Sequence, residues 1–452
     1  MKHIVGTTAR LAVTLSLLSG FSLKAATIAI IDSGTDMKHE VIAPKAWIND
    51  LEIPDNGRDE DRNGYQDDIH GWNFAESNNQ VIDYKYLGTL NDDIRKFFSV
   101  QAKAIKGTIS DDELKWMRAI VQDQEFIKRI SIYGNFMHGT HVAGISAMKS
   151  DDAKILAVKL IPTEVKLPGQ KIKESADKGF IEKLVYKAID FLAVQQMTMM
   201  EEIGYYVDGH KARVANGSFG TGYPQAKMIV ETVYKQVLKK EPTPEDVEKF
   251  AKYFINALVK EGIRMPKAAP NTLFVFAAGN DGLDNDTYPT SPTNVQADNV
   301  ISVAATIDYN AIAPFSNYGK TMVDVAAPGV AIRSSAPGNE YIQVSGTSQA
   351  APFVAGVAGK IIDTNPELSP LEVKKIIMGT VDKKDFLAGK VITNGIVNLG
   401  RAIRAADISR TSSVDEAIKV SLNEVNDVPS SESVLKPVMV PGMILPLTSQ
   451  FK

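Results

Sequence analysis

Four short segments of the sequence combine reactive side chains with turn residues. An aspartate followed by Ser-Gly ends an apolar run at residues 27–34, and two histidines lie three residues apart within residues 135–144. An asparagine follows Ala-Ala-Gly at residues 273–282, and a serine opens an Ala- and Gly-rich stretch at residues 344–356. A carboxylate, an imidazole, an amide and a hydroxyl are together the groups needed for acyl transfer through a serine nucleophile.

Each segment taken alone also allows a different interpretation. Asp32 can cap the turn after its strand, and Asn280 can be an ordinary turn residue. His138 and His141 lie near one face of a helix, which suits a metal pair, a base or a buried structural role. The glutamate of a His-Glu-x-x-His zinc motif is absent. Ser348 can be a helix cap, or a nucleophile close to the free N–H groups of a helix start.

The elements that must position these residues are predicted to be alternating strands and helices. Nearly all-apolar runs, typical of strands covered on both faces, occur at residues 27–31, 154–161, 212–215, 273–278, 300–305 and 322–326. Helix-period stretches lie between them at residues 138–148, 172–205, 226–238, 245–261, 348–362 and 370–378. This alternation predicts an α/β fold with a doubly wound, mostly parallel sheet and helices on both faces. Ligands of such sheets gather at the carboxyl ends of the strands.

The composition is globular and excludes several classes of function. The 452-residue chain has no Cys and a net charge of −4, so it offers no cysteine nucleophile and no basic surplus for binding nucleic acid. Residues 1–25 have a basic start, a short apolar run and small residues at the end, which predicts a secretory signal peptide. Later uncharged stretches contain prolines, so we expect an exported protein, periplasmic or secreted, with no stable membrane span. No pattern indicates an oligomeric state.

The chain is expected to consist of a catalytic domain at residues 26–405 and a Ser/Pro-rich C-terminal tail at residues 406–452. Two polar, helical insertions interrupt the domain at about residues 75–135 and 221–268. They suit either solvated helices outside the sheet or the walls of a substrate cleft. The composition of the tail favours a linker or loosely docked segment over a third domain.

In their order along the chain, the four segments resemble the motifs of the subtilases, the subtilisin-like serine peptidases. The matching motifs are Asp-Ser-Gly, His-Gly-Thr-His-Val-Ala-Gly, Ala-Ala-Gly-Asn and Gly-Thr-Ser-x-Ala-Ala-Pro, and the resemblance covers about residues 26–405. It implies a serine endopeptidase that cleaves protein or peptide substrates through an acyl-enzyme. Ser348 would be the nucleophile, His138 the general base and acid, Asp32 the group that orients His138, and Asn280 an oxyanion donor.

The resemblance also implies where a substrate binds. The segment Ser218-Phe219-Gly220 matches one that pairs with an extended substrate by strand addition. Thr287, before Tyr-Pro, matches the bottom of the main specificity pocket, and Ala278 and Gly279 complete the expected substrate-binding set.

An alternative function from another class is a catalytically silent binding or assembly protein with the same fold. A site released from catalytic selection should lose at least one of its reactive groups. All four reactive groups are present, which argues against this alternative. The residues that carry them are Asp32, His138, Asn280 and Ser348.

An acidic loop at residues 55–68 has the spacing of a calcium loop. Acidic or amide side chains fall at loop positions 1, 3 and 5, a glycine at 6 and a backbone carbonyl at 7. Position 12 is His70 and not Glu, so the loop is not an EF-hand. The other interpretation is a solvated acidic turn. Because similar loops occur in subtilases near the aspartate motif, we expect Ca²⁺ with Asp59, Asp61, Asn63, Tyr65 and Asp67 as ligands.

Overall fold

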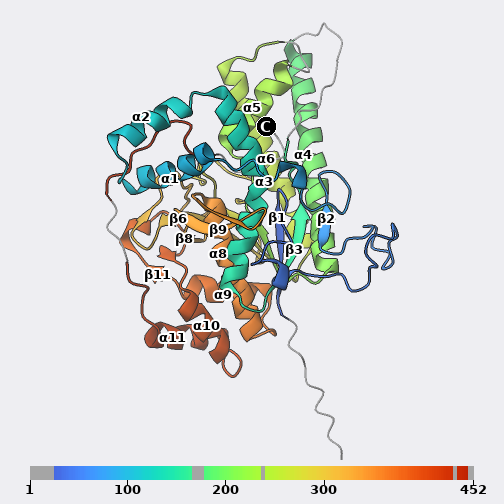
Figure 1. The fold of residues 1–452 in the computed structure, drawn as a ribbon, viewed down its shortest axis with the longest axis vertical. Helices are drawn as coiled ribbons and strands as arrows, with labels where there is room; N and C mark the ends of the chain where they lie inside the picture. Colours follow the sequence, from blue (N-terminus) through green and yellow to red (C-terminus); the bar gives the residue numbers. More distant parts are fainter. Residues whose placement is uncertain (1–24, 165–177, 236–239, 431–434, 446–452) are drawn as a thin grey trace, which may run out of the picture.

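A mostly parallel sheet forms the centre of the computed structural model, which describes residues 25–164, 178–235, 240–430 and 435–445 (Figure 1). Neighbouring strands run parallel except for one pair at the edge and one short side strand. In spatial order the strands are β11 (Asp382–Lys383), β12 (Gly395–Ile396), β8 (Val325–Pro328), β6 (Val300–Ile307), β5 (Leu273–Ala277), β4 (Val214–Gly217), β1 (Thr27–Asp32), β3 (Lys154–Lys159) and β2 (Gly71–Asn73), with β7 (Ala311–Ile312) beside β6. A separate antiparallel pair is formed by β9 (Ile332–Ala336) and β10 (Glu340–Val344).

Both faces of the sheet are buried under helices. Ile28 and Ile30 of β1 belong to one apolar cluster, whereas Ala29 and Ile31 belong to the other, because successive side chains of a strand point to opposite faces. The first cluster contains residues of α1 (Asp92–Lys106), α2 (Asp111–Ile120), α3 (Gln124–Lys149), α8 (Thr347–Thr364), α9 (Pro370–Gly379) and α10 (Leu399–Ile408). The second contains residues of α4 (Lys178–Gly209), α5 (Tyr223–Val233), α6 (Pro244–Gly262) and α7 (Arg264–Ala268). The predicted doubly wound α/β fold is thereby confirmed.

The helix that carries the two histidines is longer than predicted. Its start was expected at residue 138, but α3 begins at Gln124, where the Asp123 side chain accepts hydrogen bonds from the N–H groups of Glu125 and Phe126. His138 therefore lies in the middle of a helix whose first half belongs to the insertion at residues 75–135. Two other predictions fall partly on residues that the structure does not describe. They are the signal peptide, through residues 1–24, and the start of the predicted helix 172–205, through residues 172–177.

The first part of the expected tail is an integral part of the fold. Helix α10 crosses the predicted boundary at residue 405, and α11 (Val414–Glu424) packs against it. Arg401 of α10 binds the carboxylates of Asp382 at 2.9 Å and Asp427 at 2.6 Å, which ties the end of this region to the sheet. The serines that suggested a linker include Ser413, whose side chain caps α11. The prediction of a loosely docked segment is wrong for residues 406–428.

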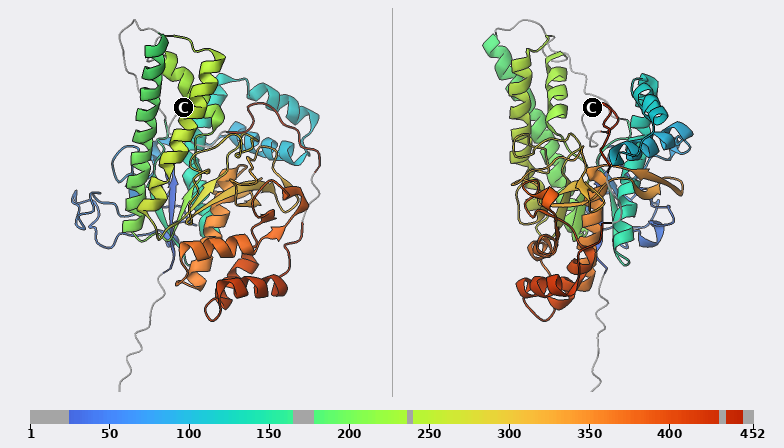
Figure 2. Two further views of the ribbon diagram at one scale, coloured as in Figure 1. Left: turned by 180° about the vertical axis from the view of Figure 1, so that it is seen from behind. Right: turned by 90° about the vertical axis from the view of Figure 1, so that its left-hand side faces the viewer.

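Helices of the two insertions stand in two separate groups, and α4, which precedes the second insertion, belongs to the second group. Helices α1 and α2 stand on one side, and α4, α5 and α6 stand on the other (Figure 2, right). Within the part of the chain that the structure describes, no helix combines the length and the apolar character needed to cross a bilayer. Residues of both groups line the cavity that contains candidate catalytic residues.

Candidate active site

Asp32 and His138 form a buried hydrogen-bonded pair. Asp32 is the last residue of β1 and is fully buried, and its Oδ1 lies 2.7 Å from Nδ1 of His138 in α3. The same carboxylate oxygen accepts the backbone N–H of Ser33 at 2.7 Å. Since Asp32 occupies Nδ1, the other ring nitrogen of His138, Nε2, is the one available to a reacting group.

Ser348 lies in the first turn of α8, and a proline explains how that turn is held. Pro352 has no N–H, so the carbonyl oxygen of Ser348 cannot make the usual helical bond to the residue four positions on. The hydroxyl of Ser218 donates to this carbonyl at 3.0 Å, and the Ser348 hydroxyl donates to the Ser218 carbonyl at 3.2 Å. Ser218 follows β4 directly, so this pair of bonds fixes the start of α8 to the carboxyl end of the sheet.

Asn280 presents its amide nitrogen to the same region. Its side-chain oxygen accepts the backbone N–H of Thr347 at 2.9 Å and the Thr347 hydroxyl at 2.8 Å. A backbone N–H can only donate, so the amide oxygen must face Thr347 and the NH₂ group must point the other way. That NH₂ group donates to the backbone carbonyl of Leu445 at 3.3 Å. An amide held in this orientation can bind an oxygen on which negative charge develops.

His138, Asn280 and Ser348 line one cavity of about 610 Å³. The two insertions supply its walls, so the second of the two interpretations of these insertions, a cleft, fits the structure. Asp281 also lines the cavity, and burial raises the pKa of its carboxyl group above the usual value. Lining residues that sequence reasoning missed come from α1, α5 and the C-terminal segment, and they include Phe98, Gln101, Pro224, Gln225, Ile444 and Leu445.

The expected substrate-binding residues differ in their surroundings. Ser218 is fully buried and engaged with Ser348, and Phe219 is buried with its ring 6.4 Å from that of Phe276. Gly279 adopts a φ of 119°, and its N–H donates to the Thr347 hydroxyl at 3.2 Å. Thr287 is exposed and stands outside the residues that line the cavity. Gly220 and Ala278 are buried.

His141 has a different environment from His138. It is completely buried, and its Nε2 lies 3.1 Å from the carbonyl oxygen of Ile342. Burial lowers the pKa of His141 to about 3, and the neighbouring His138 contributes in the same direction. A neutral, fully packed imidazole of this kind holds α3 against β10 and is not free to move protons to a substrate.

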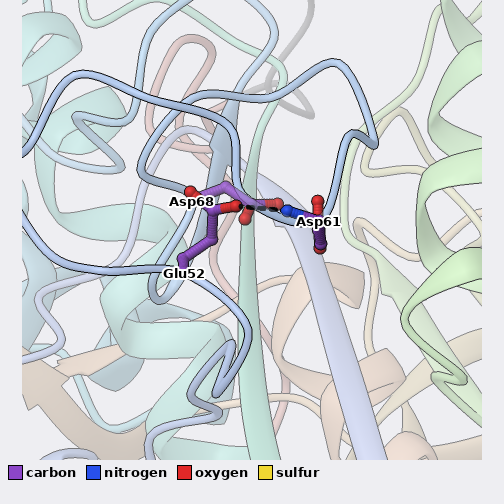
Figure 3. Close-up of side chains that lie close together, drawn as sticks. All are labelled: Glu52, Asp61 and Asp68. Carbon is purple, nitrogen blue, oxygen red and sulfur yellow. Dashed lines mark hydrogen bonds between the residues drawn. The ribbon is translucent and has the colours of Figure 1, made fainter.

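Two carboxylates of the acidic loop and one that precedes it lie close together (Figure 3). Oxygen atoms of Glu52, Asp61 and Asp68 all lie within 4.8 Å of one another, and Asp68 is fully buried. Of the five expected calcium ligands, Asp61 belongs to this cluster. The carboxylates of Asp59 and Asp67 do not belong to the cluster, and they accept backbone N–H groups of the loop. Glu52 belongs to the cluster and also accepts backbone N–H groups of the loop.

The surroundings of the cluster are polar but short of positive charge. Asn49 donates to Asp61 at 3.0 Å and to Asp68 at 2.7 Å, and His210 lies 3.1 Å from Asp68. Among the described ion pairs, none joins a Lys or Arg to any of the three carboxylates. Ca²⁺ prefers oxygen ligands such as carboxylates, so a cluster of three carboxylates without a Lys or Arg partner suits this ion.

The fold and the site define a class of protein. The model of the subtilase family matches residues 24–398, and the chain belongs to this family of subtilisin-like serine peptidases. The match contains the aspartate, histidine, asparagine and serine segments in the order in which the sequence presents them.

Similarity to individual proteins is moderate. The chain is 30% identical to the cell wall-associated protease of Bacillus subtilis (strain 168) over 249 residues, which is 55% of this chain and 22% of that protein. It is 24% identical to subtilisin-like protease 1 of Plasmodium falciparum (isolate 3D7) over 416 residues, 90% of this chain and 48% of that protein. It thus spans less than half the length of these two relatives. The solved structure of a lanthipeptide protease is 17% identical, with a TM-score of 0.45, and the match covers 84% of this chain and 89% of that one.

Proposed function

We propose that the protein is an exported serine endopeptidase that hydrolyses peptide bonds through an acyl-enzyme on Ser348. The observation that carries this proposal is the 2.7 Å pair of Asp32 and His138, buried beside a helix start that holds Ser348 in the same cavity. Family membership supports the reaction class. The signal-peptide pattern of residues 1–25 supports export.

In the proposed mechanism each group has one step. The Ser348 hydroxyl turns from the Ser218 carbonyl to Nε2 of His138, gives up its proton and attacks the substrate carbonyl. Asp32 keeps the imidazole in the required tautomer and stabilises its protonated form. His138 then passes the proton to the leaving nitrogen, and a water molecule hydrolyses the acyl-enzyme with His138 as base.

The tetrahedral intermediate places negative charge on the former carbonyl oxygen. The NH₂ group of Asn280 points into the cavity because Thr347 holds the amide oxygen on the other side. The N–H of Ser348 belongs to the first helical turn, which has no carbonyl four residues back to accept it. These two donors form an oxyanion site that is set before the substrate arrives, so no reorganisation is needed during the reaction.

A fluorophosphonate probe tests the proposal directly, because it bonds covalently to an activated serine hydroxyl. We expect the full chain to be labelled on Ser348 and the Ser348→Ala variant to stay unlabelled. The matched control is Ser369→Ala, which removes another serine hydroxyl from a helix start, at α9. It should leave labelling unchanged. A folded protein that stays unlabelled even when its cavity is open to the probe would favour the catalytically silent binding protein instead.

We also propose that Glu52, Asp61 and Asp68 hold Ca²⁺, in place of the ligand set expected from the loop spacing. Three carboxylates within 4.8 Å repel one another unless a cation or protons compensate them. The ion would fasten the loop to the body of the domain through the buried Asp68, which also accepts a hydrogen bond from Tyr206 of α4 at 2.8 Å. Its role is structural, since the cluster supplies nothing to the reacting serine.

A further inference from the structure

The end of the described chain returns to the active site. After the gap at residues 431–434, residues 435–445 run between the two groups of helices (Figure 2, right), and three of them, Gly442, Ile444 and Leu445, line the catalytic cavity. We call residues 435–445 the return segment. The contacts below show that it is built into the fold.

Helix α1 holds the return segment through backbone and side-chain bonds. The N–H of Val438 donates to the carbonyl of Ala104 at 2.9 Å, and the Gln101 amide donates to the carbonyl of Met443 at 2.6 Å. Val440 is 6% exposed and Met443 is completely buried. Both belong to the first apolar cluster, the one that contains residues of α1, α3 and α8 and that we call the main apolar cluster. Burying these two apolar side chains stabilises the seated segment, which is incompatible with a solvated linker.

A tight turn directs the segment toward the catalytic residues. The N–H of Met443 donates to the carbonyl of Val440 at 3.1 Å across Pro441 and Gly442, and Gly442 has a φ of 83°. A type II turn requires a positive φ at its third position, which glycine supplies, and proline is common at its second position. Gly107, which ends α1, has no side chain at the point of contact, where an added Cβ would lie 2.5 Å from the carbonyl oxygen of Lys436.

The segment ends on the oxyanion donor. The Asn280 NH₂ group, which is directed at the oxygen of a reacting carbonyl, donates to the carbonyl of Leu445 at 3.3 Å. The Leu445 side chain is partly buried against the main apolar cluster, beside Gly134 of α3. A backbone carbonyl bound by this amide stands where the carbonyl of a substrate peptide must stand.

We propose that the return segment is a tethered peptide ligand of the active site and restrains its activity, an inference that rests on the proposed peptidase function. Since the segment and the site belong to one molecule, the segment competes with any substrate at a high effective concentration. A substrate gains access only when the segment leaves, so the observed rate is scaled by the fraction of open molecules.

The test compares rates of fluorophosphonate labelling and of peptide hydrolysis in the full chain and in two variants. Gly442→Val places a β-branched residue at a φ of 83° and disrupts the turn without touching a catalytic group. A second variant stops after residue 434. We expect both rates to rise by about tenfold or more. A synthetic peptide of residues 435–452 should inhibit the shortened variant, and a scrambled peptide should not.

The matched control is Gly389→Val, which creates the same kind of strain at a φ of 70° in open space outside the cavity. It should leave both rates unchanged. If the shortened variant does not fold, Gly442→Val still decides the question. If the full chain and Gly442→Val react at equal rates, the proposed restraint is wrong, whereas the proposed peptidase function stands. If neither the full chain nor any variant reacts with the probe, both the proposed function and the proposed restraint are wrong.

Discussion

Gly139 of α3 lies directly against the backbone of Gly34, two residues after Asp32. A Cβ atom built on Gly139 would lie 2.3 Å from the carbonyl oxygen of Gly34, far inside any van der Waals contact. Because His138 precedes Gly139, this approach sets how closely the imidazole meets the carboxylate. The absence of one side chain thus permits the 2.7 Å bond between Asp32 and His138.

The first prediction follows from this contact. Gly139→Ala should push α3 away from β1, destabilise the protein by about 1–3 kcal/mol through overpacking, and slow labelling of Ser348. Gly134→Ala in the same helix is the control, since its Cβ would meet only Leu445 Cδ1, at 3.7 Å. The control should be neutral or stabilise by up to about 1 kcal/mol. Chemical denaturation and labelling rates measure both effects, and an inert Gly139→Ala would show that the contact does not set the geometry.

The second prediction concerns the tautomer of His138. Asp32→Asn keeps the shape of the side chain but can offer an NH₂ group to Nδ1, which favours the wrong tautomer. We expect kcat for a peptide substrate to fall by about 10⁴-fold, with the fold retained. The control is Asp36→Asn, a buried aspartate near the same turn that binds Lys38 and Gly338 N–H groups instead of a histidine. Loss of activity in both variants would point to structural damage.

The strand ends that carry Asp32 and Asn280 were predictable from the sequence alone. Residues 27–31 and 273–278 are nearly all apolar because both faces of the sheet are buried, so the position of Asp32 and Asn280 after these runs followed from the pattern. The pairing of Asp32 with His138 was implied only by the resemblance. No local pattern specifies which helix lies against which strand end.

Two features were not predictable because long-range contacts decide them. The Ser and Pro content of the C-terminal region suggested a linker, but Ser413 caps a helix and Pro441 forms a turn that inserts Met443 into the core. An apolar run at residues 438–445 with a Pro-Gly pair was the signal that could have shown this. In the acidic loop, spacing along the chain suggested Asp59 and Asp67 as ligands. The fold instead brings in Glu52 from before the loop and Asp68 from a loop position that the spacing does not mark as a ligand.

The third prediction separates the two calcium ligand sets. In a Ser348→Ala background, which prevents self-digestion, removing Ca²⁺ with EDTA should lower Tm, because a ligand bound only to the native state adds about 2.7 kcal/mol at a hundredfold excess over Kd. Glu52→Gln should abolish the difference in Tm between calcium and EDTA. Asp59→Asn should retain it, since that carboxylate lies outside the cluster of three. The reverse pattern would restore the ligand set expected from the loop spacing.

The fourth prediction is a pH dependence caused by His141. Burial lowers its pKa in the folded state to about 3, against a normal value of 6.5. Above pH 6.5 the imidazole is neutral in both states, whereas below it only the unfolded state binds the proton. Stability should therefore fall with decreasing pH from 6.5 toward 3, by at most about 1.4 kcal/mol per pH unit from this group.

His141→Gln removes the titrating group and keeps a donor for the Ile342 carbonyl. Free energies of unfolding measured between pH 7 and 5 should depend less on pH in this variant than in the parent. The same substitution at the less buried His70 is the control. If His141→Gln leaves the slope unchanged, His141 does not account for the loss of stability.

The fifth prediction concerns the bond after Leu445, which the sequence makes an X–Pro bond to Pro446. Proline replaces the amide hydrogen by a ring carbon, which crowds the nitrogen that a general acid must protonate when an X–Pro bond is cleaved. If the Leu445 carbonyl lies in the register of a substrate, Pro446→Ala should let the protein hydrolyse its own chain there. Water would supply a hydroxyl to Leu445 and a hydrogen to the new amino terminus, releasing residues 446–452.

Mass spectrometry should detect this cleavage product. Its rate of formation should not depend on protein concentration, because the segment and the site belong to one molecule, and no product should form when Ser348→Ala is added. A Pro446→Ala protein that is labelled by the probe yet stays intact would mean that the segment obstructs the site without occupying it as a substrate does.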